Sequence, residues 1–283
     1  MTDAVLGVDV GGTAIKTWTA SGAGPTVPTP KDDPTGERVA DVIAALVAAL
    51  PEPVAAVGVA VPGIVDDAAG VCRLSVNLGW RDVPVRDLVA ARVGLPVAVT
   101  HDVRAGAIAE RTSGAGAGTS GLLLFAPLGT GLALAVVDER GRPLGTGWAG
   151  EVGQLRFPSG STAGLRVEEV ASAGGLARRY GAPDAATVLA ARAAGDARAA
   201  ACWDETVEAL ADVLAWAIGL LAPTTVVIGG GLAHAGATLF DPLQEALGLR
   251  LGELPTPALL PAKHGSSAAA VGTARLAADL LRG

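Results

Sequence analysis

Residues 5–19, VLGVDVGGTAIKTWT, carry the strongest structural signal in this chain. They predict an apolar strand that ends in an acid, a turn of two glycines and a threonine, and a second strand that carries a lysine. We expect the glycines to adopt positive φ, so that the turn N–H groups and the nearby hydroxyl and ammonium groups can donate hydrogen bonds to phosphate oxygens. The residues with this chemistry are Asp9, Gly11, Gly12, Thr13 and Lys16.

An ordinary glycine-rich hairpin is the alternative interpretation of this turn, but it leaves the acid, the threonine and the lysine unexplained. The turn lacks the G-x-x-x-x-G-K-[ST] pattern, and no helix pattern follows it, so it is neither of the two common nucleotide-binding loops. Asp9 stands where a carboxylate can hold Mg²⁺ directly or through water. We therefore predict a phosphate-binding hairpin with magnesium at its mouth.

The same element recurs in the second half of the chain. Residues 122–141, LLLFAPLGTGLALAVVDERG, again predict an apolar strand, a turn of glycine and threonine, and a second apolar strand. A supersecondary unit repeated at half-chain distance indicates duplicated lobes that face one another across a cleft. The second predicted phosphate turn consists of Gly129, Thr130 and Gly131.

Composition gives the boundary between the two lobes. Residues 111–120, RTSGAGAGTS, have the small and polar residues of a linker. We expect an N-terminal lobe of residues 1–112 and a C-terminal lobe of residues 113–283, with a final helix over residues 267–281 packed back on the N-terminal lobe.

The remaining pattern is that of an α/β protein. Residues 21–35 are rich in Pro, Gly and Asp and predict a loop, whereas Trp203 and Trp216 lie in a long apolar helix and are expected in the core. Two buried strands open into glycines where backbone can approach a ligand, at Gly63 and at Gly229, Gly230 and Gly231. Helices are expected over residues 36–50, 84–93, 103–110, 168–180, 185–194 and 201–221, and strands over 54–61, 97–100 and 225–228.

Composition narrows the possible partners. The chain has 283 residues, of which half are hydrophobic, and 28 acidic against 21 basic residues give a net charge of −7. Because no basic cluster is present, we expect neither nucleic acid nor a membrane as partner, and a small molecule instead. Cys72 and Cys202 are expected to be reduced, buried thiols. The first strand begins at residue 5 and no apolar run reaches 18 residues, so we expect a cytoplasmic protein.

Six motifs in this order resemble the repressor, open reading frame and kinase (ROK) family of bacterial sugar kinases, within the actin, sugar kinase and Hsp70 superfamily. The resemblance covers nearly the whole chain and implies a two-lobed, actin-like ATPase fold that uses ATP. The motifs are Val8–Thr13 with Lys16, Val61–Gly63, Asn77–Trp80, Leu95–Val97, Gly129–Gly131 and Ile228–Gly231, the last of which is similar to the adenosine-binding turn.

The resemblance also implies roles for individual side chains. Asp102, after the strand of residues 97–100, matches the catalytic base, although it could instead cap the helix that follows. Glu151 and Glu168 could be solvated acids and Asn77 a turn residue, but their matched positions favour sugar hydroxyl binding. The implied substrate-binding residues are Gly63, Asn77, His101, Asp102, Glu151, Gln154 and Glu168.

The chain departs from the family pattern at three places. His101 stands where the family has asparagine, Gln154 stands where it has a zinc-binding histidine, and the zinc-binding Cys-x-Cys-Gly-x-x-Gly-Cys run is absent from residues 155–167. We therefore expect no zinc site, and we expect the loop of residues 157–166 to be ordered by packing.

Together these features predict an ATP- and Mg²⁺-dependent kinase for the 6-hydroxyl of a glucose-like hexose. Because His101 and Gln154 alter the expected sugar contacts, a hexose modified at carbon 3 or 4, or an amino sugar such as 3-amino-3-deoxyglucose, is the expected substrate. The resemblance implies a homodimer. The alternatives are a non-catalytic sugar sensor of the same fold, a repressor, which would need an additional DNA-binding domain, and a kinase that uses polyphosphate.

Overall fold

The computed structural model describes residues 4–282, and the chain folds as two compact units. Unit 1 contains the chain up to Thr112, residues 141–149 and the chain from Ser266 onward, whereas unit 2 contains residues 113–140 and 150–265. The division therefore differs from the expected lobes at residues 141–149, which lie with unit 1. This short segment has little apolar sequence, so its pattern gave no reason to separate it from its neighbours.

Unit 1 is built on a five-stranded sheet in the order β3-β2-β1-β4-β8. β1 pairs antiparallel with β2 and parallel with β4, and β4 pairs parallel with β8, so the first hairpin extends a parallel sheet. The strands are β1 (Val5–Val10), β2 (Ala14–Thr19), β3 (Gly22–Pro28), β4 (Ala56–Val61) and β8 (Val97–His101).

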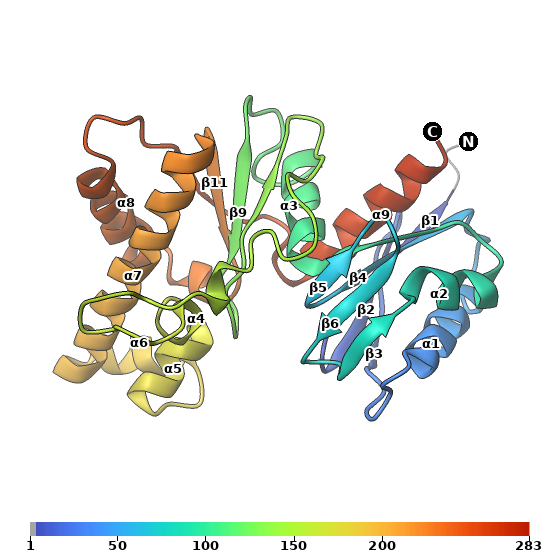
Figure 1. The fold of residues 1–283 in the computed structure, drawn as a ribbon, viewed down its shortest axis with the longest axis horizontal. Helices are drawn as coiled ribbons and strands as arrows, with labels where there is room; N and C mark the ends of the chain where they lie inside the picture. The colour runs from blue at the N-terminus through green and yellow to red at the C-terminus, as the bar shows by residue number, and fades with distance from the viewer. Residues whose placement is uncertain (1–3, 283) are drawn as a thin grey trace. The chain divides into compact units, whose positions relative to one another are not determined.

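Alternation along the strands divides the helices of unit 1 between the two faces of this sheet. Even-numbered side chains of β1, such as Leu6 and Val8, form one apolar core with helices α1 (Glu37–Ala48) and α2 (Val85–Val93). The opposite face meets α9 (Ala268–Leu280), the red helix of Figure 1, which also packs against α3 (Asp102–Thr112).

Glycine allows α9 to lie with its backbone in contact with the sheet. A Cβ at Gly7 of β1 would lie 2.0 Å from Ala270 O, and one at Gly58 of β4 would lie 2.0 Å from Thr273 O. On the far side of α9, a Cβ at Gly272 would lie 1.8 Å from Ala105 O of α3. No side chain other than hydrogen fits at these positions, so the three glycines fix the distance between α9, the sheet and α3.

Unit 2 repeats the sheet of unit 1 without the edge strand. Its order is β10-β9-β11-β12, with an antiparallel β9–β10 pair and parallel β9–β11 and β11–β12 pairs. These strands correspond in order to β2-β1-β4-β8, which confirms the predicted duplicated α/β fold. They are β9 (Leu123–Pro127), β10 (Ala135–Val137), β11 (Thr225–Gly229) and β12 (Ala258–Pro261).

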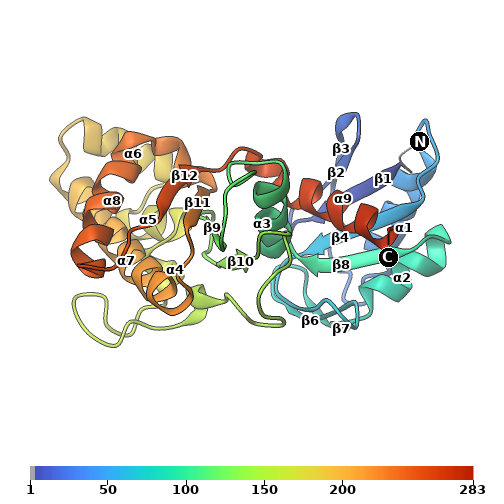
Figure 2. The same ribbon diagram turned by 90° about the horizontal axis from the view of Figure 1, so that it is seen from above.

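Helices α7 (Ala197–Leu221) and α8 (Ala237–Leu251) pack against one another over this sheet (Figure 2). Trp203, Leu210 and Leu214 of α7 are buried in the core of unit 2 with Leu124 of β9 and Val226 of β11. The other helical elements are η1 (Val152–Gln154), α4 (Val167–Val170), α5 (Ala173–Tyr180), α6 (Ala185–Ala193) and η2 (Gly231–Ala235), with η3 (Gly265–Ser267) before α9.

Two expectations about local structure are wrong. The predicted loop of residues 21–35 contains β3, whose prolines are tolerated because β3 is the edge strand of the sheet. Trp216 is 57% exposed, whereas Trp203 is 1% exposed as expected, because α7 buries only one face and Trp216 lies on the other.

A three-stranded antiparallel sheet in unit 1 has no counterpart in the sequence prediction. It consists of β5 (Ile64–Asp66), β6 (Val71–Ser75) and β7 (Trp80–Val83), which are too short to show a clear period. Cys72 on β6 is buried and free, as expected, whereas Cys202 is free but partly exposed. None of the helices formed by residues 4–282 is both long and apolar enough to span a bilayer.

Candidate active site

The first predicted phosphate turn is held by its carbonyl groups. Thr29 Oγ1 donates to Gly11 O at 2.6 Å, Lys31 Nζ donates to Gly12 O at 2.7 Å, and the Thr29 N–H donates to Thr13 O at 3.0 Å. Within residues 4–282, no acceptor meets the N–H of Gly12 or Thr13. The turn therefore presents free N–H donors and no free carbonyls, as anion binding requires.

The conformational reason given for the two glycines is wrong. Neither Gly11 nor Gly12 has φ in the left-handed region. Space explains them better, because a Cβ at Gly11 would lie 3.0 Å from Ala14 O and one at Gly12 would contact Asn77 Cβ at 3.4 Å. The turn thus lies against Asn77, and a pocket of about 480 Å³ in unit 1 is lined by Gly12, residues 29–34 and residues 77–79.

Asp9 and Lys16 lie opposite one another in the β1–β2 hairpin. Lys16 Nζ donates to Ser266 O at 3.0 Å, which places the ammonium group near the start of η3. Burial, and then the negative charge of Asp102, raises the pKa of Asp9 to about 7 against the opposing charge of Lys16. Asp9 and Asp102 are therefore close enough to repel one another.

Asp102 is the first residue of α3, directly after β8, at the same edge of the sheet as the end of β1. Asp102 Oδ1 lies 2.9 Å from His101 Nε2 and accepts the Val103 N–H at 2.7 Å. Within residues 4–282, Oδ2 meets no donor, and the side chain is 34% exposed. Burial favours a raised pKa for this carboxyl, but the interactions with His101, the Val103 N–H and Arg104 hold its pKa below the usual range. The result is an ionised carboxylate with one free oxygen.

His101 is only 5% exposed, so it lies behind Asp102 as part of its support. Gly63, at the end of β4, has φ of 109°, and a Cβ there would lie 2.1 Å from Leu74 O, so only glycine fits this turn. Asn77 is exposed between β6 and β7. Unit 1 thus brings Asp9, Asp102 and Gly63 to the ends of neighbouring strands.

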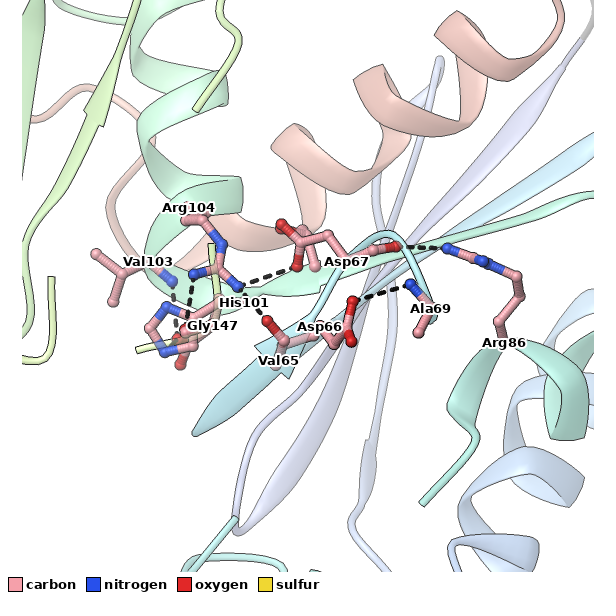
Figure 3. A network of polar contacts seen from close by, with 11 residues as sticks. Val65, Asp66, Asp67, Ala69, Arg86, His101, Val103, Arg104 and Gly147 are labelled. Carbon is pink, nitrogen blue, oxygen red and sulfur yellow. Dashed lines mark hydrogen bonds and ion pairs between the residues drawn. The ribbon is translucent and has the colours of Figure 1, made fainter. Parts of the chain in front are cut away.

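Figure 3 shows a network of polar contacts around Arg104, two residues after Asp102 in the sequence, that the sequence did not reveal. Arg104 is 2% exposed; its Nη2 donates to Val65 O at 2.9 Å and to Asp67 Oδ1 at 3.0 Å, and its Nη1 donates to Gly147 O at 3.2 Å. Thr100 Oγ1 donates to the other Asp67 oxygen at 3.2 Å. Arg104 therefore ties β5 and residues 141–149 to the helix that carries the predicted base.

The second phosphate turn, in unit 2, is supported in the same way as the first. The Gly174 N–H donates to Gly129 O at 3.1 Å, and Ser172 Oγ donates to Thr130 O at 3.1 Å. The N–H groups of Gly129, Thr130 and Gly131 meet no acceptor among residues 4–282. Each unit therefore has a turn with carbonyls fixed from behind and N–H groups left for an anion.

The three glycines at the end of β11 are explained by different steric constraints. A Cβ at Gly229 would lie 3.1 Å from the ring of Phe125, and one at Gly230, where φ is 76°, would lie 2.5 Å from Leu128 O. Gly231 begins η2 and has open space where a Cβ would stand. The first two glycines thus let β11 pass close to β9, and the third leaves room at the surface.

Three predicted sugar-binding residues belong to unit 2, and a fourth residue joins two of them. Arg166 Nη1 lies 2.7 Å from Glu168 Oε1 and 3.1 Å from Gln154 Oε1. Glu168 is largely buried and Gln154 is exposed, whereas Glu151 is partly buried at the start of η1. Sequence patterns contain no signal for Arg166, because a lone arginine in an irregular loop has no period or motif.

The loop that replaces the zinc run is ordered by hydrogen bonds as well as by packing. Phe157 is 6% exposed, its N–H donates to Leu165 O at 3.0 Å, and its carbonyl accepts the Gly164 N–H at 2.9 Å. The Val167 N–H then donates to Leu155 O at 2.8 Å. Among residues 4–282, no three His, Cys, Asp or Glu side chains form a group that could hold a metal ion.

Comparison with known proteins agrees with this geometry. The pattern of the ROK family matches residues 5–280. The chain is 32% identical over 278 residues to the glucokinase of Halalkalibacterium halodurans, which covers 85% of this chain and 84% of the relative. The crystal structure of the ROK hexokinase from Thermus thermophilus superposes with a TM-score of 0.85, 28% identity and 99% coverage of both chains.

A second solved structure contains a bound sugar and a bound nucleotide analogue. The ROK family glucokinase from Streptomyces griseus, in complex with glucose and AMPPNP, has a TM-score of 0.80 and 29% identity to this chain, with 98% of this chain and 99% of that chain covered. With a family match across almost all of its residues and the actin-like fold of these kinases, the chain belongs to the ROK family and is a sugar kinase.

Proposed function

We propose that the protein transfers the γ-phosphoryl group of ATP to the 6-hydroxyl of a glucose-like hexose. The observation that carries this proposal is Asp102, an ionised carboxylate whose Oδ2 meets no donor within residues 4–282 and which lies close to the first phosphate turn. Phosphoryl transfer needs alignment, charge neutralisation and a group that accepts the hydroxyl proton. Asp102 is suited to the last of these, with Oδ2 as the accepting atom.

The nucleotide is assigned to the two turns and to the glycines after β11. The free N–H groups of Gly12, Thr13 and the turn of residues 129–131 bind phosphate oxygens, and Lys16 supplies positive charge. Gly231, with open space around it, leaves room for the adenosine. These groups bind the donor without covalent chemistry, which is how most phosphoryl-transfer enzymes work.

The residues present also fit Mg²⁺. Ions of this kind are usually held by one or two carboxylates together with substrate phosphates, and Asp9 is a carboxylate beside the first turn. Its raised pKa shows that burial and Asp102 oppose its ionisation, an opposition that a divalent cation relieves. When bound, the ion would neutralise phosphate charge. Asp9 would hold it directly or through water.

Sugar recognition is assigned to side chains that accept hydrogen bonds and to side chains that both donate and accept them. Glu151 and Glu168 accept hydrogen bonds from hydroxyl groups, whereas Asn77 and Gln154 both donate and accept hydrogen bonds. Gly63 allows the tight turn at the end of β4, where a Cβ would clash with Leu74 O. His101 lies behind Asp102 with Nε2 directed at it, so an imidazole nitrogen serves the base where the family has a carboxamide.

The absence of a carboxamide at position 101 supports a finer proposal about specificity, because His101 lies behind Asp102 and is not itself placed to pair a sugar hydroxyl. A site that pairs a different set of polar groups discriminates against a sugar that leaves one of them unpaired, by about 1–3 kcal/mol for each buried group. We propose that a hexose altered at carbon 3 or 4, such as 3-amino-3-deoxyglucose, has a higher kcat/KM than glucose, with Glu151 as partner of the ammonium group.

A coupled assay of ADP release tests both the proposed reaction and the proposed sugar specificity. Wild type and His101→Asn are compared with glucose, 3-amino-3-deoxyglucose, mannose and N-acetylglucosamine, with ATP as donor and with polyphosphate in a parallel assay of sugar phosphate. Absence of hexose-dependent ADP release would overturn the proposed reaction. Glucose ranking first in wild type, with the same ranking in His101→Asn, would overturn only the proposal on specificity.

A further inference from the structure

Arg166 is the residue of unit 2 that joins two predicted sugar-binding side chains. One nitrogen, Nη1, lies 2.7 Å from Glu168 Oε1 and 3.1 Å from Gln154 Oε1. We infer that Arg166 is a positioning residue for the sugar: it fixes the Glu168 carboxylate and the Gln154 amide so that both face the hydroxyls in one arrangement. This inference rests on the proposed function and adds a residue that neither the motifs nor the family resemblance identified.

Glu168 lies between Arg166 and the second phosphate turn. Its Oε1 bonds to Arg166, and its Oε2 lies beside Gly131, 2.8 Å from where a Cβ on that glycine would stand. The Glu168 backbone joins the same turn, because Ser172 Oγ bonds to Glu168 O at 2.6 Å and to Thr130 O at 3.1 Å. The carboxylate that binds sugar is thus in contact with the second phosphate turn, and its orientation depends on Arg166.

The hairpin of residues 155–167 determines where Arg166 lies. Arg166 pairs with Arg156 in an antiparallel bridge, and its N–H donates to Glu169 Oε2 at 2.6 Å at the start of α4. The Arg166 guanidinium therefore faces Gln154, Glu168 and, at 3.7 Å from Nε, Glu169. Backbone pairing fixes the position of Arg166, and the Arg166 side chain then holds Glu168 and Gln154 through its bonds to them.

Loss of the Arg166 guanidinium should weaken the binding of sugar. Glu168 is only 16% exposed, and without the guanidinium its carboxylate would keep little solvation and lose its charged partner. It would then rotate toward solvent, and this change removes an oriented acceptor for a hydroxyl. The free N–H groups of the phosphate turns do not involve Arg166, so binding of ATP should be unaffected.

The test compares Arg166→Met with Arg156→Met. Arg156 lies across the same hairpin, but its side chain bonds to the Gly164 carbonyl and to neither sugar-binding group, so it controls for damage to the hairpin. Arg166→Met should raise the sugar KM and the directly titrated sugar Kd about 10- to 100-fold while the KM for ATP changes less than about threefold. Arg156→Met should leave both sugar constants near wild type, and Arg166→Lys, which keeps the charge, should recover part of the loss.

A double substitution separates positioning from a general loss of structure. In a Glu168→Ala background, Arg166→Met should add little to the sugar Kd, because the group that it positions is gone. An active Arg166→Met with wild-type sugar constants, or an equal effect of Arg156→Met, would overturn the inference. A wild type that binds hexose but releases no ADP overturns only the proposed reaction, since the Kd comparison still tests Arg166. A wild type that binds no hexose overturns both.

Discussion

Replacing Asp9 with asparagine should stabilise the protein at high pH and abolish its activity. Burial and the charge of Asp102 raise the pKa of Asp9 from its ordinary 3.8 to about 7, so the folded state binds a proton more tightly than the unfolded chain. Asp9 therefore contributes stability that is fully present below pH 3.8 and is lost as the pH rises to about 7. A gap of about three pH units, at about 1.4 kcal/mol for each, corresponds to about 4 kcal/mol.

Asparagine has the shape of a protonated aspartate and no charge, so it avoids this loss. Between pH 5 and pH 8 the free energy of unfolding of Asp9→Asn should gain about 3 kcal/mol relative to wild type, or roughly 5–10 °C in Tm. The matched control is Glu52→Gln, which removes an exposed carboxyl before β4 and should show no such gain. Thermal unfolding of the three proteins in EDTA, at pH 5, 6, 7 and 8, gives the comparison.

Activity should move in the opposite direction. If Asp9 holds Mg²⁺ at the first turn, Asp9→Asn should lose at least about 100-fold in kcat at pH 8, where it is more stable than wild type. A Tm difference between Asp9→Asn and wild type that is the same at pH 5 and pH 8 would show that Asp9 does not titrate in this range. Full activity of Asp9→Asn would show that Asp9 does not hold the magnesium ion.

Four other predictions concern the remaining groups. Asp102→Asn should fold and bind sugar but lose roughly 10²–10⁴-fold in kcat, and retained activity of the purified variant would exclude it as the base. Gly12→Val should raise the Kd for nucleotide, because its side chain must fit beside Asn77 and over the free N–H groups; an unchanged Kd would remove this turn from the phosphate site. Arg104→Met should move the acidic limb of the pH–kcat profile to higher pH, since Arg104 helps to hold the pKa of Asp102 low, whereas Arg104→Lys should move it less. A zinc-selective chelator should leave folding and turnover intact, removal of Mg²⁺ should abolish turnover, and one zinc per chain by elemental analysis would contradict this prediction.

Sequence patterns were most informative where a short segment contains the whole pattern of a structural element. The two hairpins were predicted because an apolar strand, a glycine turn and a second strand all lie within twenty residues. The same local reasoning failed for β3, whose glycines and prolines are typical of a loop but are tolerated at a sheet edge. It also failed for Trp216, since an apolar side chain on a long helix can face solvent when only one side of the helix is covered.

Side chains that act across long stretches of sequence could not be predicted at all. Lys31 and Thr29 hold the first turn from a segment that sequence patterns indicate only as loop, and Ser172 holds the second from 42 residues away. Arg104 and Arg166 carry no motif, because their roles depend on which carbonyls and carboxylates the fold brings near them. A single sequence shows the groups that touch ligand more readily than the groups that support them.

The supports of the donor and sugar groups are separate in the structure, and this has a functional consequence. The first turn is held by Thr29 and Lys31 through its carbonyls, whereas the Glu168 carboxylate is held by Arg166. The Ser172 hydroxyl contacts both kinds of group, through Thr130 O and Glu168 O. Changes at Thr29 or Lys31 should therefore alter nucleotide affinity alone and changes at Arg166 sugar affinity alone. Ser172→Ala should alter both, because the same hydroxyl supports the second phosphate turn and the helix turn that presents Glu168.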